Sequence, residues 1–548
     1  MSTFGTYNFV GTKDFVIENN IIKGIEVPCK ITHDSYGELI LEAMRANPNF
    51  IGQIDGLTGR KETFAEMTEK SVKCAMWLKE LNIQPDDVIG ICTHNQPDMY
   101  VPCFASLYVG AIYNPWWDDG LTKEIARYFI NLTRPKILFA NEASARLALE
   151  VAEELGVEIK IVVFGKLPGL RSLDDILAAQ DSNIVPEFRC TKLQSLDHPA
   201  VIMYTSGSTG LPKGVQHSHR SLFGNVIKFG TLNDELKSET TMLFSPLSWI
   251  SGVFVMLKGV VKPDTRIICP DFVEERAFQL IEKFKVNWML LGISTAFRLQ
   301  KSPAKSNYDL SSVKFIVVGG STLNEDRQKS LIEMFPDATV CQAYGSTELG
   351  ITGVRQEINF KSGSCGRVMK NISLKVVDPD TGKVLGPNQT GEACFNSPSM
   401  MTCYYGNPEA TRETMDAEGW LHTGDLIRYD EEGHIFFVDR MKEIIKYRGH
   451  HVSSGMIEKV LLTHSEVLEA AVVAIPHDVD DEHPMAFVVK VPNATVTEED
   501  LEKLVSNILP NSMYLRGGVR FLEELPHTSA GKVSRSALRN LAKSYVCS

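Results

Sequence analysis

Apolar and polar residues follow two periods along most of the chain, and the period changes from one segment to the next. Segments 36–46 and 63–81 repeat apolar residues every three to four positions, which predicts helices, whereas the short apolar runs 87–92 and 159–164 predict buried strands. The same patterns predict helices at 98–109, 147–155, 219–232, 274–284 and 324–334, and strands at 111–113, 135–140, 200–203, 240–244, 266–269, 288–291 and 313–318. This alternation favours parallel sheet covered by helices.

The pattern changes at residue 366, where short strands are separated by turns rich in Gly, Pro and Asn. This change predicts a smaller, β-rich subdomain. A boundary is expected near Asp439, after a strand at 434–438. The remaining residues predict a compact α+β unit with helices at 454–463 and 497–508, strands at 470–475 and 486–491, and a polar end.

Composition excludes several classes of protein. The 548 residues are too many for one hydrophobic core, and the net charge of −12 argues against a nucleic-acid partner. No run of eighteen apolar residues predicts a membrane span, and the first residues lack a secretory signal pattern. The 11 cysteines contain no Cys-x-x-Cys pair and are typical of a reduced, intracellular protein. The chain does not end in the peroxisomal signal Ser-Lys-Leu. A peroxisomal and a cytoplasmic location both stay open.

Segment 204–214, which follows the strand predicted at 200–203, is rich in glycine and hydroxyl residues and ends in Lys213-Gly214. Glycines let backbone N–H groups turn inward, hydroxyls donate further hydrogen bonds, and a lysine adds positive charge, which together suit a polyanionic phosphate. The segment is not a Walker A loop, because Gly-Lys-Ser/Thr is absent and Pro212 interrupts the run. An ordinary polar surface loop is the alternative.

Four further clusters carry candidate chemistry. Segment 342–348 combines an aromatic residue, which can stack on a purine, with a carboxylate, which can bind Mg²⁺. Asp425 follows a tight turn and could accept both ribose hydroxyls, although an Asx turn explains it equally well. The basic run 439–449 and the terminal Lys532 could each be no more than solvated surface.

Other catalytic classes lack their motifs. His217 and His219 have no metal-binding partners at suitable spacing, and His-Glu-x-x-His does not occur. Gly-x-Ser-x-Gly is also absent, so the sequence does not support a serine hydrolase.

Taken together, the five clusters resemble the ordered motifs of the adenylate-forming enzymes. That superfamily contains acyl-CoA synthetases, coumarate-CoA ligases, peptide-synthetase adenylation domains and beetle luciferases. The motifs occur in order over nearly the whole chain, and segments 361–367, 385–388 and 514–521 add to the likeness. The resemblance is strongest to insect luciferase-like fatty acyl-CoA synthetases.

The resemblance implies an α/β fold with a large N-terminal domain at 1–438, a hinge at 439–443 and a mobile C-terminal lid at 444–548. The large domain would contain two helix-covered, mainly parallel sheets and a β-rich subdomain from about 366. Lys442 matches the hinge residue of the family.

The resemblance also assigns site residues. Tyr344 would stack on adenine, Glu348 would bind Mg²⁺, and Asp425 and Arg440 would hold the ribose. Lys532 would bridge the substrate carboxylate and the α-phosphate, and Lys446 would serve the second step. The remaining positions implied for ATP binding or catalysis are Thr205, Ser206, Gly207, Ser208, Thr209, Gly210, Lys213, Gly319, Gly320, Ser321, Gln342, Ala343, Gly345 and Thr347.

The implied reaction joins a carboxylic acid to coenzyme A in two steps and uses ATP and Mg²⁺. A medium- or long-chain fatty acid is the expected substrate, and the oligomeric state stays open. A luciferase-type monooxygenase is the first alternative, and a non-catalytic nucleotide- or acyl-binding relative is the second. The acid pocket is expected at Asn225, Trp249, Ser251, Gly252 and Ser346, several of which depart from the luciferase pattern.

Overall fold

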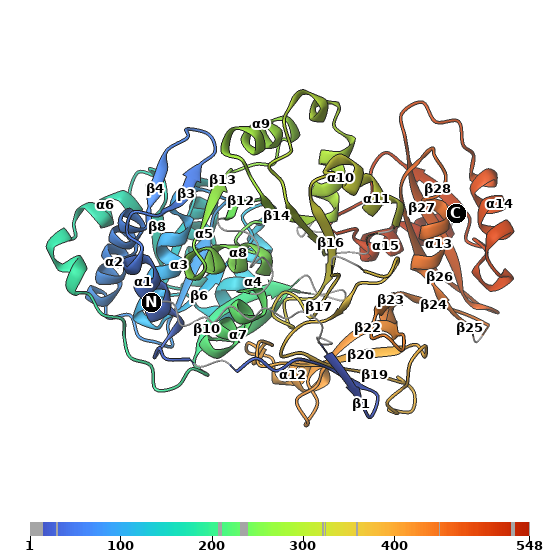
Figure 1. The fold of residues 1–548 in the computed structure, drawn as a ribbon, viewed down its shortest axis with the longest axis horizontal. Helices are drawn as coiled ribbons and strands as arrows, with labels where there is room; N and C mark the ends of the chain where they lie inside the picture. The colour runs from blue at the N-terminus through green and yellow to red at the C-terminus, as the bar shows by residue number, and fades with distance from the viewer. Residues whose placement is uncertain are drawn as a thin grey trace.

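The fold is built on four β-sheets, three in a large N-terminal domain and one in a small C-terminal domain (Figure 1). The computed structural model describes residues 15–28, 31–205, 211–230, 239–320, 323, 325–357, 360–448, 450–527 and 532–546. This arrangement confirms the expected α/β fold class. Among those residues, no helix is both long and apolar enough to cross a membrane.

The first sheet has eight strands, and its centre is parallel. Two of its central strands, β5 (Val88–Cys92) and β7 (Ile137–Ala140), contain no polar side chain other than a buried cysteine, because helices cover both faces. In sheet order the strands are β21 (Cys403–Tyr404), β11 (Lys213–Ser218), β10 (Pro199–Thr205), β6 (Ile112–Pro115), β5 (Val88–Cys92), β7 (Ile137–Ala140), β8 (Lys160–Val163) and β9 (Arg171–Ser172). The covering helices are α1 (Tyr36–Ala46), α2 (Phe64–Glu80), α3 (Tyr100–Val109), α4 (Lys123–Thr133), α5 (Glu142–Leu155) and α6 (Leu173–Ala178).

The second sheet has nine strands and a parallel centre. Its order is β18 (Arg367–Val368), β17 (Val354–Arg355), β16 (Thr339–Tyr344), β15 (Phe315–Gly319), β14 (Trp288–Gly292), β12 (Glu239–Leu243), β13 (Asp264–Ile268), β3 (Ile51–Asp55) and β4 (Lys61–Thr63). Its helices are α8 (Ile250–Val261), α9 (Glu274–Phe284), α10 (Ile293–Lys301) and α11 (Glu325–Met334), whereas α7 (His219–Gly230) packs against β11 of the first sheet and against α8. Two early strands, β3 and β4, thus join a sheet whose other strands come much later in the chain.

The third sheet is the predicted β-rich subdomain, and all of its neighbouring strands are antiparallel. Its first two strands come from the start of the described chain, so the blue hairpin in Figure 1 lies beside β19. The order is β1 (Phe15–Glu18), β2 (Ile21–Gly24), β19 (Ser373–Val377), β20 (Gly391–Asn396), β22 (Leu421–Tyr429) and β23 (Ile435–Arg440), with helix α12 (Pro408–Thr414) packed nearby.

The small domain carries a five-stranded sheet that follows a short 3₁₀ turn, η4 (Met441–Glu443). The sequence predicted only a polar segment at the end of the chain. The structure instead has a helix at residues 535–546, whose Leu538 and Ala542 are buried against the sheet. The strands are β25 (His450–Ser453), β24 (Ile444–Tyr447), β27 (Asp481–Lys490), β26 (Val467–His477) and β28 (Val519–Leu522). The helices are α13 (Ser454–Leu461), α14 (Glu498–Ile508) and α15 (Arg535–Val546).

Several elements escaped the sequence patterns, and α8 gives the physical reason. Nine of its twelve residues are buried, so apolar residues occur all round and the helical period disappears. By contrast, α1 was predicted with its observed limits, because it has one apolar face and begins after Ser35, whose side chain accepts from the Glu38 N–H.

Candidate active site

The ends of parallel strands bring the predicted nucleotide-binding residues to one region. β15 ends at Gly319 and β16 ends at Tyr344, and these strands are neighbours in the second sheet. Glycine is required at Gly345, because an added Cβ would lie 1.8 Å from the carbonyl oxygen of Ile351, and Gly320 has a φ of +91°. Ligands commonly bind at the carboxyl ends of such strands.

Part of the predicted phosphate loop lies outside the described residues. Those positions are Ser206, Gly207, Ser208, Thr209 and Gly210, and Ser321 also lies outside them. The two flanks are described, because Thr205 ends β10 and Lys213 begins β11, and these residues face each other across the antiparallel pair. The predicted loop therefore joins two adjacent strands of the first sheet.

Tyr404 connects the Lys213 side of this loop to the segment that follows β16. Its hydroxyl donates to Oε1 of Glu348 at 2.9 Å, and the Lys213 ammonium lies 4.7 Å from the centre of its ring. Burial and the Glu348 charge raise the pKa of Tyr404, so the hydroxyl stays protonated and remains a donor. The sequence analysis missed Tyr404, which lies on the short strand β21, between the motif segments and outside all of them.

The same segment is fixed by backbone contacts. His217 Nε2 donates to the carbonyl oxygen of Thr347 at 2.8 Å, and the Leu349 N–H donates to Oγ of Ser346 at 3.2 Å. Gln342 and Ala343 are buried within β16. Ser346, Thr347 and Glu348 are therefore held in a defined turn at the edge of the sheet.

Asp425, Arg440 and Tyr344 form a contact group where the second and third sheets meet. Asp425 on β22 is the direct partner of Arg440 on β23, and Nε of Arg440 lies 3.4 Å from Oδ1 of Asp425. The Tyr344 hydroxyl donates to Oδ2 of Asp425 at 2.6 Å. Burial raises the pKa of Asp425, although the charge of Arg440 and this hydrogen bond oppose the shift. The sequence predicted all three residues but not the bond between Tyr344 and Asp425.

The turn before Asp425 is held by a carboxylate that the sequence analysis did not select. Glu392 on β20 accepts the Gly424 N–H at 2.9 Å and the Nδ1–H of His422 at 2.8 Å. The other ring nitrogen of His422 lies 3.5 Å from Asp416. Gly424 has a φ of +68°, which favours glycine at this position. Glu392 therefore shapes the backbone that presents Asp425.

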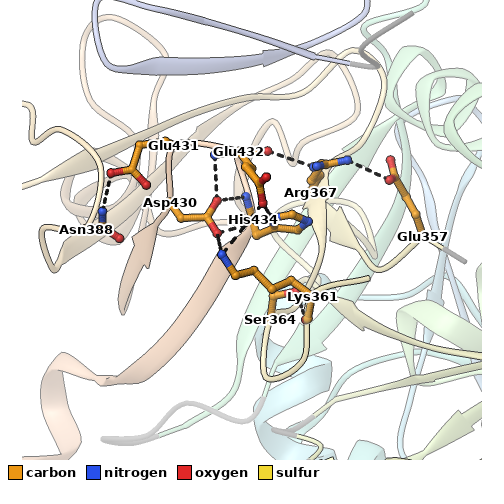
Figure 2. Close-up of polar contacts among 9 residues, drawn as sticks. All are labelled: Glu357, Lys361, Ser364, Arg367, Asn388, Asp430, Glu431, Glu432 and His434. Carbon is orange, nitrogen blue, oxygen red and sulfur yellow. Dashed lines mark hydrogen bonds and ion pairs between the residues drawn. The ribbon is translucent and has the colours of Figure 1, made fainter. Parts of the chain in front are cut away.

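The far end of the β22–β23 hairpin is anchored by a second polar network (Figure 2). Lys361 Nζ lies 2.8 Å from Oδ2 of Asp430, and Nδ1 of His434 lies 3.4 Å from the same oxygen. The Ile435 N–H donates to the carbonyl oxygen of Gly366 at 2.8 Å. Segment 361–367, which supported the family resemblance, thus fixes the hairpin that carries Asp425 and Arg440.

The small domain contributes Lys532 to the same region. Solvent reaches this side chain, yet it stands among residues of both domains and experiences the charges of Arg440, Asp425 and Glu348. Partial loss of solvation among these residues and the nearby Arg440 lower the pKa of Lys532, while the two carboxylates oppose that shift. The structure therefore brings the terminal lysine to the acidic residues that the sequence places far away.

Lys446 and Lys442 occupy exposed positions, on β24 and in η4. The backbone N–H of Lys446 donates to Glu482 of the small domain at 2.8 Å. Within the described part of the chain, no recorded polar contact joins either lysine side chain to Glu348 or Asp425.

The residues predicted for the acid pocket have different environments. Asn225 is buried and lines an apolar cavity, and its Nδ2 donates to the carbonyl oxygen of Ser399 at 3.4 Å. Trp249 and Ser251 are half-buried at the start of α8, and neither lines this cavity. Close packing requires glycine at Gly252, since an added Cβ would lie 2.2 Å from the carbonyl oxygen of Pro246. The other lining residues are Tyr36, Leu222, Ile250, Val253, Phe254, Leu257 and Ile351.

Family models and known proteins match both domains of the chain. A family model described as AMP-binding enzyme matches residues 42–405, and one described as AMP-binding enzyme C-terminal domain matches residues 456–532. The chain is 30% identical to luciferin 4-monooxygenase of Photuris pensylvanica, over 96% of this chain and 99% of that protein. It is 31% identical to 4-coumarate–CoA ligase 3 of Oryza sativa subsp. japonica, over 97% and 96% of the two chains.

Solved structures extend the likeness. The luciferase-like enzyme from the nonluminescent mealworm Zophobas morio is 31% identical, with a TM-score of 0.72 over 78% of this chain and 100% of that chain. ATP-bound MatB from Rhodopseudomonas palustris has a TM-score of 0.84 over 92% of this chain and 99% of that chain. At 24% identity, the second match is a likeness of fold alone.

Proposed function

Because the chain belongs to the AMP-binding enzyme family, we propose that it is an ATP-dependent acid–CoA ligase. It adenylates a carboxylic acid with release of pyrophosphate, and it then transfers the acyl group to coenzyme A with release of AMP. The observation that carries this proposal is the convergence of Glu348, the Asp425–Arg440–Tyr344 group and Lys532 from two domains.

Different parts of the site bind the nucleoside and the phosphates of ATP. Asp425 accepts the ribose hydroxyls and is held by Arg440 and Tyr344. The ring of Tyr344 lies near Phe395 and Phe437 and offers an aromatic surface to adenine. The segment between Thr205 and Lys213, together with Thr347, binds the phosphates, and the backbone at 319–321 lines the adenine and acid sites.

In the first step, a carboxylate oxygen of the acid attacks the α-phosphorus, and the bond to the pyrophosphate oxygen breaks. Lys532 donates to the oxygens that carry the developing negative charge, where a positioned cation stabilises the transition state most effectively. Its lowered pKa follows from its position between the domains, and the nearby carboxylates favour the charged form.

Magnesium fits this site through Glu348. The carboxylate is held by the Tyr404 hydroxyl at the place where the phosphates would lie, and Mg²⁺ is commonly bound by one or two carboxylates together with substrate phosphates. When bound, the ion would neutralise charge on the phosphate oxygens. Tyr404 orients the carboxylate for this purpose.

In the second step, the thiol sulfur of coenzyme A attacks the acyl carbonyl carbon, and AMP leaves. Lys446 serves this step after the small domain rotates at residues 439–443, with Lys442 as the hinge residue. The proposed division is thus a large domain at 1–438 and a lid at 444–548. Rotation lets one adenylate-binding surface meet two sets of catalytic groups.

The acid is proposed to be a medium- or long-chain fatty acid. This proposal rests on the resemblance to fatty acyl-CoA synthetases. The cavity beside Asn225 is lined mainly by apolar side chains, but it would have to enlarge to hold an alkyl chain. Trp249, Ser251, Gly252 and Ser346 are proposed to border the acid, in keeping with the family resemblance.

The test is incubation with ATP, Mg²⁺, coenzyme A and a panel of aliphatic acids, coumaric acid and beetle luciferin. Formation of AMP and acyl-CoA with an aliphatic acid supports the proposal, and Lys532→Ala is the control. If every acid yields AMP but no acyl-CoA, the proposed ligase function is contradicted. Strong light from luciferin would indicate a luciferase instead. Turnover of coumaric acid alone contradicts the fatty acid but not the ligase.

A further inference from the structure

The two domains touch at a second place, away from Lys532. Helix α11 of the large domain lies beside the small domain (Figure 1), and its Arg327 contacts strand β26. Nη2 of Arg327 on α11 donates to the carbonyl oxygen of Leu468 on β26 at 3.5 Å. The Arg327 guanidinium also lies 4.2 Å from the centre of the Phe297 ring on α10, which limits its orientation. Arg327 therefore reaches across the domain boundary from a supported position.

The residue after Leu468 brings a negative charge to this contact. Burial lowers the pKa of Arg327, and the carboxylate of Glu469 opposes this shift. Lys301, at the end of α10, is likewise near Arg327 and Glu469, whose charges act on its pKa in opposite directions. The charge of Glu469, next to the Leu468 carbonyl that Arg327 contacts, thus acts on two basic residues of the large domain.

Glu469 is also linked to the segment that carries Lys532. Its Oε2 lies 3.9 Å from Nε2 of His527. His527 forms an antiparallel bridge with Val533, the residue directly after Lys532, and the Ser534 N–H donates to the carbonyl oxygen of Pro526 at 2.7 Å. An interaction that keeps Glu469 close to the large domain therefore also restrains His527 and Val533, the residues that flank the Lys532 segment.

We propose that Arg327 and Lys301 on one side and Leu468 and Glu469 on the other form a docking contact that keeps Lys532 in the active site. These are positioning residues, since they act through the small domain and not on the substrate. The inference rests on the proposed function, in which the domain must rotate between the two steps. The docking contact then serves adenylation and is broken before thioester formation.

The first test compares the two half-reactions in the full-length protein. Glu469→Lys places a third positive charge beside Arg327 and Lys301, so acid-dependent exchange of labelled pyrophosphate into ATP should fall roughly tenfold. Formation of acyl-CoA from added acyl-adenylate and coenzyme A should stay within about twofold of wild type, because this step does not use the docked orientation. Equal losses in both half-reactions, or no loss in either, would overturn the proposal.

Three further variants distinguish an effect on docking from effects of charge and of folding. Glu499→Lys makes the same charge change on α14, where the side chain is 73% exposed, and should leave both half-reactions as in wild type. Glu469→Arg combined with Arg327→Glu restores opposite charges and should recover part of the exchange rate that Glu469→Arg alone loses. Absence of recovery would contradict a direct interaction across the boundary.

A measurement without substrate distinguishes failure of the docking contact from failure of the proposed function. Amide hydrogen exchange in segments 325–334 and 467–471 should be faster in Glu469→Lys than in wild type and Glu499→Lys, because undocking exposes both surfaces. Unchanged exchange there overturns the docking contact whatever the activity. If amide exchange is faster in Glu469→Lys but the wild-type protein activates no acid, the docking contact is supported and the proposed ligase function is contradicted.

Discussion

Replacing Tyr344 with phenylalanine removes one hydroxyl from the proposed ribose site and keeps the aromatic ring near Phe395 and Phe437. The lost group donates to Oδ2 of Asp425 at 2.6 Å. Stacking on adenine should persist, since the ring is unchanged. The perturbation therefore tests the hold on Asp425 separately from the aromatic surface.

The size of the effect follows from the environment of Asp425. Its side chain is only 14% exposed, so water replaces the lost donor poorly. A hydrogen bond to a charged group contributes about 1.5–3 kcal/mol. Because Arg440 still faces the carboxylate at 3.4 Å, we expect the lower part of that range, which corresponds to roughly tenfold weaker ATP binding.

The pH dependence has a definite sign. Burial raises the pKa of Asp425, so the carboxyl takes up a proton at higher pH than an exposed aspartate does. The protonated group accepts ribose hydroxyls less well, and ATP affinity should fall as pH decreases toward that pKa. Tyr344→Phe removes one of the groups that lower the pKa, so its affinity should begin to fall at a higher pH than in wild type.

Calorimetric titration with ATP, without acid substrate, measures the effect as a change in Kd. The matched ligand is 2′,3′-dideoxy-ATP, which lacks the hydroxyls that Asp425 is proposed to accept. Wild type should discriminate strongly between the two nucleotides, and Tyr344→Phe should discriminate less. Equal weakening for both nucleotides, or unchanged ATP affinity, would refute the reasoning.

Further substitutions test the separate steps. Lys532→Ala should slow pyrophosphate exchange by roughly 10²–10³-fold and spare acyl-CoA formation from added acyl-adenylate, and equal losses would contradict its assigned role. Lys446→Ala should show the reverse pattern in the same two assays, and slowed exchange would count against it. Lys442→Pro should preserve exchange and impair acyl-CoA formation, unless the domain does not rotate there. Glu392→Gln should weaken ATP binding a few-fold in titration, because the Gly424 N–H loses a charged acceptor, and an unchanged Kd would limit Glu392 to a structural role.

Local patterns predicted the elements whose signals are local. Helix α9 was predicted with its observed limits, Glu274–Phe284, because its apolar residues lie on one face. Helix α15 was missed because its polar flanks hide the two buried residues Leu538 and Ala542. Strands β1 and β2 were missed because they are short, and β2 pairs with β19, more than three hundred residues later.

The candidate site shows the same division. The motif order identified Tyr344, Asp425, Arg440 and Lys532, since each belongs to a segment with a recognisable composition. Tyr404 and Glu392 are the supporting residues that sequence reasoning did not find. No local pattern marks these two residues, because their roles depend on contacts formed only in the folded chain. Tyr404 donates to Glu348, and Glu392 accepts the Gly424 N–H.

The sequence by itself determined the α/β class, the family and the residue types that suit a nucleotide, because periodicity and motif composition are properties of short segments. Only the tertiary structure decided that an N-terminal hairpin completes the third sheet and that Arg327 reaches the carbonyl oxygen of Leu468 across the domain boundary. It also decided that Lys532 comes close enough to Glu348 and Asp425 for their charges to act on it. These contacts depend on how whole sheets and domains pack, and no local pattern encodes the relative orientation of two domains.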